Sequence, residues 1–285
     1  MTRPVLALAT LLFSVAAGCA GSSPPSQTAA APPPVASTVP TKATEPVATP
    51  TASDAMAPDL APYQAIVGAA DRDDADKKLD EGRHPAELLA FIGVKPGMHV
   101  AELGAAGGYT SELLARAVGP SGVVYGQNPE WLVKRYAEKP WSERLAKPVM
   151  KNVVRVDREF DDPFPKEAHD LDAVTIMLFY HDTVWSKVDR DKMNRAVLAA
   201  LKPGGVYVVV DTAARKGAGI DETQSLHRID ESVVKDEVLK AGFRLGAEAD
   251  FLKNPADTHD WNASPKAAGE RRGTADRFVL KFVKP

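Results

Sequence analysis

Short, largely apolar strands alternate with helical segments along most of the chain, and this alternation constrains its fold more than any other feature. Residues 99–103, 171–177 and 206–210 are three such strands, and valine, leucine and isoleucine dominate them. A strand that is apolar on both sides has to be covered on both sides, as in a parallel sheet between two layers of helices. The pattern therefore predicts an α/β fold over residues 63–285.

The other expected elements fit the same architecture. Four more strands are expected at 122–126, 153–156, 244–251 and 276–283, and helices at 111–117, from 129 onward, at 189–201 and at 231–241. Residues 202–205 (KPGG) are expected to form a tight turn before the fifth strand. We expect a Rossmann-like, seven-stranded, mostly parallel sheet with helices on both faces and an antiparallel last strand. Ligands of such sheets bind beyond the carboxyl ends of the strands.

Composition excludes several classes of protein. The 285 residues carry a formal net charge of −3, and 44% are hydrophobic and 26% charged, which is the balance of an ordinary globular protein. Without an excess of basic residues, the chain is not expected to bind nucleic acid. Its one cysteine, Cys19, excludes a disulfide framework and a cysteine-based zinc site.

The first 19 residues resemble a bacterial lipoprotein signal peptide. Arg3 supplies the positive start, residues 5–17 form the apolar run, and Cys19 follows small residues. Ala16 departs from the pattern, which usually has a large aliphatic residue three positions before the cysteine. The resemblance implies that Cys19 is lipidated and anchors the protein to a membrane of the bacterial cell envelope, on the periplasmic side. An ordinary cleaved signal peptide is the alternative.

Residues 20–62 differ in composition from the rest of the chain. They contain ten of the 23 prolines, and alanine, serine and threonine fill most of the remaining positions. Such a segment has little apolar surface to bury, so we expect a disordered linker between the signal peptide and the folded domain.

A turn of small residues follows the first strand. It reads Gly104-Ala105-Ala106-Gly107-Gly108, preceded by Glu102-Leu103 and followed by Tyr109 at the start of a helix. Small residues let the backbone approach a ligand closely, and a helix N-terminus offers free N–H groups to an anion. Ala106 and Tyr109 occupy two glycine positions of the dinucleotide motif, which disfavours a nucleotide-dependent oxidoreductase. A turn that binds no ligand is the alternative.

The spacing acid-x-Gly-x-small-x-Gly is met by Glu102, Gly104, Ala106 and Gly108. It resembles the first motif of class I S-adenosylmethionine (SAM)-dependent methyltransferases. Other stretches resemble further motifs of that family in the same order: 95–98, 119–122, Asp157, 201–205 and 241–243. Three short stretches, 179–182, 226–230 and 277–282, resemble a group of predicted bacterial methyltransferases.

The resemblance implies that the chain binds S-adenosyl-L-methionine. The implied cofactor contacts are Glu102, Gly104, Ala106, Gly107, Gly108, Tyr109, Asn128 and Asp157, with Asp157 near the adenine amine. Asn128 stands where many members have an acid that binds the ribose hydroxyls. Because Asn-Pro-Glu is also a good helix start, Asn128 is either a ribose contact or an N-cap, and Gln127 is a weaker candidate for the ribose.

Polar residues near the carboxyl ends of the strands are candidates for the acceptor side. We expect His181 to act as a base toward a small-molecule acceptor, with Asp182 as its partner; the alternative is that both brace their loop. Histidines and aspartates of this region show no tight ligand spacing in the sequence, so no metal is expected. In the long loop before the last strand, Trp261 either stacks on a substrate or pins the loop to the domain.

The signal peptide conflicts with the implied activity, because SAM is a cytoplasmic metabolite. The leading hypothesis is a SAM-dependent methyltransferase with an unknown small-molecule acceptor. The second hypothesis is a non-catalytic envelope protein that binds a nucleoside-like or other small ligand.

Overall fold

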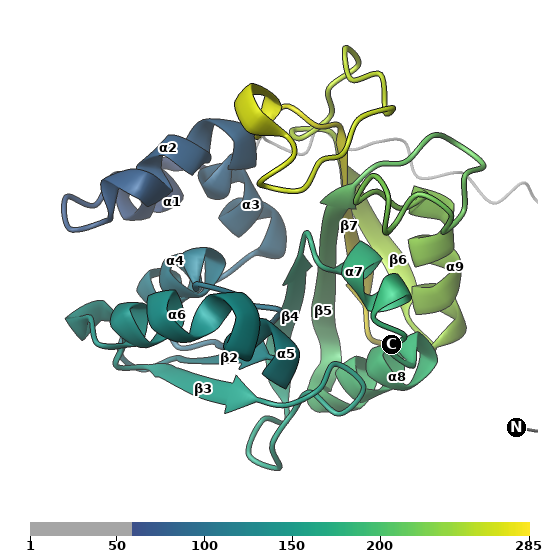
Figure 1. Ribbon diagram of the computed structural model, residues 1–285. Coiled ribbons are helices and arrows are strands. Elements are labelled where there is room, and N and C mark those ends of the chain that lie inside the picture. Colours follow the sequence, from purple (N-terminus) through teal and green to yellow (C-terminus); the bar gives the residue numbers. More distant parts are fainter. Residues whose placement is uncertain (1–58) are drawn as a thin grey trace, which may run out of the picture. The chain divides into compact units, whose positions relative to one another are not determined.

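The computed structural model describes residues 59–285, which contain a seven-stranded sheet with helices on both faces (Figure 1). The strands are β1 (His99–Leu103), β2 (Val123–Asn128), β3 (Val153–Asp157), β4 (Leu171–Met177), β5 (Leu201–Thr212), β6 (Arg244–Ala249) and β7 (Arg277–Val283). Their order across the sheet is β3-β2-β1-β4-β5-β7-β6. The first five strands are parallel, and β7 is antiparallel to both of its neighbours, β5 and β6. The expected fold class is therefore confirmed.

Helices pack on both faces because alternate residues of the central strands point in opposite directions. On one face, Ala101 and Val209 belong to the same buried core as residues of α7 (Tyr180–Trp185), α8 (Arg190–Ala200) and α9 (Glu231–Lys240). On the other face, Val100 and Val208 pack with α3 (Pro85–Ile92), α4 (Tyr109–Val118) and α6 (Glu138–Leu145). Both sides of these strands are thus buried, as their apolar sequences predict.

The remaining helical segments are short or lie before the sheet. They are α1 (Ala61–Val67), α2 (Asp74–Arg83), α5 (Glu130–Leu132), the π-helix η1 (Val133–Ala137) and the 3-10 helices η2 (Pro148–Met150) and η3 (Gly269–Arg271). Helix α1 begins two residues before the expected start of the domain at 63. No helix within 59–285 combines the length and apolar character needed to cross a membrane.

Two strand boundaries differ from the expected ones. Residues 202–205 are not a separate tight turn, because β5 already begins at Leu201, which pairs with Leu171. The register then shifts, so that Ala173 pairs with Val206, and the extra residues form an irregularity within the strand. Strand β2 continues past 126 to Asn128, so the candidate ribose contact ends a strand.

The signal peptide at 1–19, with Cys19, and most of the linker at 20–62 lie outside the residues that the structure describes. The lipid anchor remains a prediction from the sequence.

Candidate functional site

The carboxyl ends of β1, β4 and β5 meet at one edge of the sheet, because these strands are neighbours and parallel (Figure 1). The turn of residues 104–108, called the glycine turn below, follows β1. Residues 178–182 follow β4, and Asp211 lies near the end of β5. The fold therefore gathers the candidate cofactor turn and the candidate acceptor residues at one edge.

Two glycines of the turn are required by the packing of the chain itself. Gly104 has φ +67°, and a Cβ added there would lie 2.8 Å from the ring of Phe179. Gly108 has φ +82°, and an added Cβ would lie 2.2 Å from Trp141. Positive φ values and contacts this short both disfavour a side chain. The packing of the chain therefore explains why glycine stands at these two positions, without reference to a ligand.

Side chains at the end of β2 hold the backbone of the turn. The N–H of Gly104 donates to Oε1 of Gln127 at 3.1 Å. The N–H of Ala106 donates to Oδ1 of Asn128 at 2.7 Å, and Nδ2 of Asn128 donates to the carbonyl of Ala106 at 3.2 Å. Helix α5 has Pro129 as its N-cap residue and no side-chain cap bond, so the N-cap interpretation of Asn128 is wrong. The amide of Asn128 is instead bound to Ala106, and a ribose contact remains a prediction.

Glu102 is a buried acid at the end of β1. Its side chain accepts a hydrogen bond from the hydroxyl of Ser111 on α4, and only 2% of the residue is exposed. Burial raises the pKa of Glu102 to about 7, although the hydrogen bonds from Ser111 and Thr110 act in the opposite direction. The hydrogen bond between Glu102 and Ser111 therefore connects β1 to α4 on either side of the turn.

Tyr109 and Gly107 connect the turn to helices α2 and α6. The hydroxyl of Tyr109 donates to Asp80 at 2.6 Å, and the guanidinium of Arg83 lies 4.3 Å from the centroid of the Tyr109 ring. Arg144 on α6 donates to the carbonyl of Gly107. Both residues thus support the turn through contacts that the sequence did not indicate.

Asp157 lies at the end of β3, two strands away from β1. Its carboxylate accepts hydrogen bonds from Nε of Arg155 at 2.8 and 3.0 Å, and 41% of its side chain is exposed. The carboxylate is therefore open to solvent at the same end of the sheet as the turn. The adenine contact of Asp157 stays a prediction.

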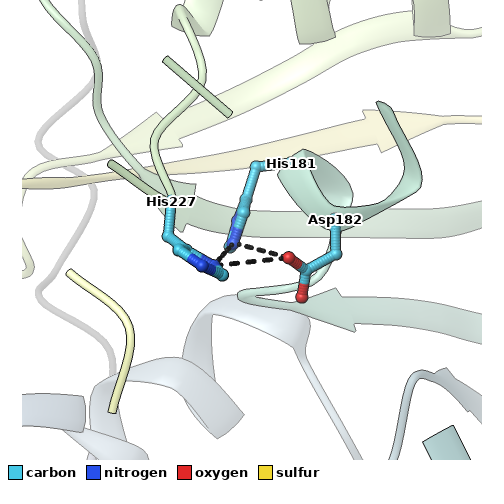
Figure 2. A group of neighbouring side chains, drawn as sticks. All are labelled: His181, Asp182 and His227. Atoms are coloured by element: carbon cyan, nitrogen blue, oxygen red, sulfur yellow. Dashed lines mark hydrogen bonds and ion pairs between the residues drawn. The ribbon is translucent and has the colours of Figure 1, made fainter. Parts of the chain in front are cut away.

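His181, Asp182 and His227, called the histidine cluster below, converge on one point (Figure 2). Nε2 of His181 lies 3.1 Å from Oδ1 of Asp182 and 3.2 Å from Nδ1 of His227. Nδ1 of His227 lies 3.5 Å from Oδ1 of Asp182. On the other side of the His181 ring, Nδ1 lies 2.7 Å from Oδ1 of Asp211. The sequence predicted His181 and Asp182 as a pair of acceptor-side residues. The fold places His227 and Asp211 in contact with His181.

The electrostatics of this cluster follow from burial and from its carboxylates. Burial alone would lower the pKa of His181, but the charges and hydrogen bonds of Asp211 and Asp182 outweigh it and raise the pKa to about 10. Burial would raise the pKa of Asp182, but hydrogen bonds from His181 and His227 hold it well below its usual range. An imidazolium has no lone pair to accept a proton, so a role of His181 as a base requires that it first loses its proton.

The long loop between β6 and β7 is pinned to the domain by a buried ion pair. Arg228 donates to Asp257 at 2.8 Å, and both side chains are fully buried. Nε1 of Trp261 donates to Asp257 at 2.7 Å, and the Arg228 guanidinium lies 4.8 Å from the Trp261 ring centroid. These contacts support the expected alternative in which Trp261 pins the loop.

No protein-family model matches the chain. Solved structures with a similar fold identify the fold class. A SAM-dependent methyltransferase from Aquifex aeolicus aligns with a TM-score of 0.51 at 20% identity, over 74% of this chain and 97% of that chain. A chain from the complex between the Haloferax volcanii Trm112 methyltransferase activator and the putative methyltransferase aligns with a TM-score of 0.52 at 22% identity, over 74% and 93%. The chain has the class I methyltransferase fold. At these identities, the likeness establishes the fold alone.

Within the methyltransferase fold, the predicted cofactor residues fall into two groups. Glu102, Asn128 and the turn with Tyr109 form one connected unit, whereas Asp157 stands apart at the end of β3. The histidine cluster adjoins the first group through Phe179, which lies against Gly104 and precedes His181 by two residues.

Proposed function

We propose that the chain is a SAM-dependent methyltransferase that acts on a small-molecule acceptor. The observation that carries the proposal is the contact between Gly104 and Phe179, because it joins the glycine turn to the segment that bears His181. A methyl donor at the turn and an acceptor at the histidine cluster would then be neighbours on one sheet edge. The transferred methyl would leave the sulfonium sulfur as the acceptor lone pair forms the new bond, and the protein aligns the two.

On the cofactor side, we propose that the N-terminus of α4, which directly follows the turn, attracts the carboxylate of SAM through the helix dipole. The turn beside it has no bulky side chains, and its Gly107 is half-buried, with the carbonyl bonded to Arg144. We propose that Asp157 accepts a hydrogen bond from the adenine amine and that Asn128 acts mainly by shaping the turn through Ala106.

On the acceptor side, we propose that His181 and Asp182 face the reacting atom. Both are buried, whereas 27% of the His227 side chain is exposed, so the cluster is approached from the side of His227. A base is needed only for an acceptor that must lose a proton.

Substitution of Asp157 tests the cofactor side without threatening the fold. We expect Asp157→Asn to weaken binding of radiolabelled SAM to the full chain at least tenfold, because a hydrogen bond to a charged group contributes about 1.5–3 kcal/mol. Asp162→Asn is the matched control, since Asp162 is another exposed acid that pairs with an arginine, Arg158. Equal affinities in the two variants would remove Asp157 from the site.

A second function is favoured by the hydrogen bonds that the backbone of the turn already makes within the chain. The N–H groups of Gly104, Ala105 and Ala106 all have partners at the end of β2. This internal bonding of the turn is the observation that favours the alternative, a non-catalytic protein that binds a nucleoside-like or other small ligand. Binding of SAM without methyl transfer to any of a panel of small acceptors would favour it.

We also propose that the protein is held at a membrane of the bacterial cell envelope by a lipid on Cys19. The support is the sequence of residues 1–19. Cys19→Ser should move the full chain from the membrane fraction to the soluble fraction, whereas retention in the membrane would contradict the anchor.

A further inference from the structure

Two groups of carboxylates and histidines in the described part of the chain are close enough to share a cation, and they differ in how their charge is compensated. In the first, Asp76 and Glu112 pair with Arg144, and Asp73 pairs with Lys147. That group is neutralised by the chain itself, because basic side chains occupy the space between its carboxylates.

The histidine cluster is not compensated by lysine or arginine side chains of residues 59–285. Asp182 and the neighbouring Asp211 are both buried, and no lysine or arginine of residues 59–285 forms an ion pair with either. Buried carboxylates require a positive partner, because their transfer out of water is costly. Here that partner is a proton on the imidazole of His181 or a bound cation.

The distances within the cluster match those of a metal site. The three facing atoms, Nε2 of His181, Oδ1 of Asp182 and Nδ1 of His227, are 3.1, 3.2 and 3.5 Å apart. In a tetrahedral zinc site with bonds of about 2.0–2.1 Å, two ligand atoms lie about 3.3–3.4 Å apart. The three atoms therefore match one face of such a tetrahedron in size. Figure 2 shows the three side chains pointing toward one another.

The surroundings hold these atoms in place. Asp211 accepts from the backbone N–H of His181 at 2.8 Å and contacts its Nδ1 at 2.7 Å, so Nε2 is the atom that faces the cluster. A carboxylate behind a histidine in this way is the usual support of a metal ligand. His227 has φ +51°, a backbone conformation that non-glycine residues rarely adopt and that positions its ring.

We propose that His181, Asp182 and His227 bind one Zn²⁺ ion through these three atoms and leave its fourth position open. This revises the expectation of no metal. The sequence could not show the set, because His227 lies 46 residues after His181 and meets it only in the fold.

An open position on zinc binds an oxygen ligand and lowers its proton affinity. A hydroxyl acceptor bound there would release its proton to solvent water, so that no protein base would be needed. That use of the ion rests on the proposed function, whereas binding of the ion does not.

The test is a Zn²⁺ titration of the full chain after treatment with a chelator. We expect one ion per chain, and we expect Co²⁺ to give the strong visible absorption of a tetrahedral complex. Asp182→Asn and His227→Ala should each weaken Zn²⁺ binding at least tenfold. His169→Ala is the matched control, because His169 is exposed and pairs with its neighbour Asp170, away from the cluster. All variants carry Cys19→Ser, since a thiolate also binds zinc.

Unchanged affinity in Asp182→Asn and His227→Ala, or no binding by the parent chain, would overturn the proposal. Circular dichroism of each variant separates loss of the site from loss of the fold. Titration of the metal-free chain with SAM tests the proposed function separately, so the failure of one proposal is distinguishable from the failure of the other.

Discussion

Asp211 holds His181 by two contacts, one to the backbone N–H at 2.8 Å and one to the ring Nδ1 at 2.7 Å. Because Asp211 lies near the end of β5 and His181 lies in the first turn of the helix after β4, this pair connects two neighbouring strand ends. The contact also determines which ring nitrogen faces Asp182 and His227.

Asp211→Asn should therefore destabilise the domain. An amide presents one acceptor oxygen where the carboxylate presents two, so one buried donor loses its partner, at a cost of about 1–3 kcal/mol. Urea denaturation of the parent and the variant measures this difference. Asp250→Asn changes an exposed aspartate and should have no effect. Equal losses in the two variants would show that the Asp211 contacts do not stabilise the fold.

Glu102 should make stability depend on pH. Its pKa is about 7 in the folded protein and 4.5 when unperturbed, so the folded state binds the proton more tightly. Its contribution is fully present below pH 4.5 and is lost as the pH rises through 7, with a total change of about 3 kcal/mol. Glu102→Gln should remove this decline, so the variant gains stability relative to the parent between pH 5 and pH 8.

Denaturation at several pH values, with Glu143→Gln as an exposed control, measures this effect. If the parent and Glu102→Gln lose stability in parallel over that range, Glu102 is ionised in the folded state.

The close packing of Trp141 on Gly108 should make that glycine irreplaceable. Gly108→Ala combines a positive φ, which costs about 1–2 kcal/mol, with a clash that costs about 1–3 kcal/mol more. Gly217→Ala separates the two effects, since Gly217 has nearly the same φ, +84°, and nothing within 4 Å of an added Cβ. We expect the unfolding free energy to fall more in Gly108→Ala, and equal losses would contradict the packing.

The buried pair of Arg228 and Asp257 should control the loop at 250–276. Arg228→Met leaves the Asp257 carboxylate buried without its partner and should cost about 3–5 kcal/mol. Faster amide hydrogen exchange should appear across that loop. Lys139→Met removes an exposed pair with Glu143 and should change neither quantity, so similar exchange in both variants would refute the pinning role.

How much of this could be predicted from the sequence depends on the kind of interaction that holds each part. The strands were predictable because burial on both faces requires apolar residues such as Val208 and Val209. Helix α2 was not, because it is held by polar contacts, such as those of Asp76 and Asp80 with distant partners, and it shows no apolar stripe. The start of β5 was missed because Lys-Pro-Gly-Gly has the composition of a turn.

The residues of the candidate site also differ in how far the sequence predicted their roles. The glycine turn was found by its spacing, which is local in the sequence. The role of Asn128 was missed because its amide bonds Ala106, 22 residues earlier, and no local pattern shows this contact. His181 and Asp182 were predicted from the sequence. Their contact with His227 was not, because it depends on the path that the chain takes after β5.

Calorimetric titration of the full chain with SAM, and then with its demethylated product, tests most directly whether the turn between β1 and α4 is a cofactor site. The account predicts one molecule of SAM per chain and displacement of SAM by the product, because both carry the same nucleoside and carboxylate. No heat of binding with either compound, from a chain whose circular dichroism shows it to be folded, would contradict it.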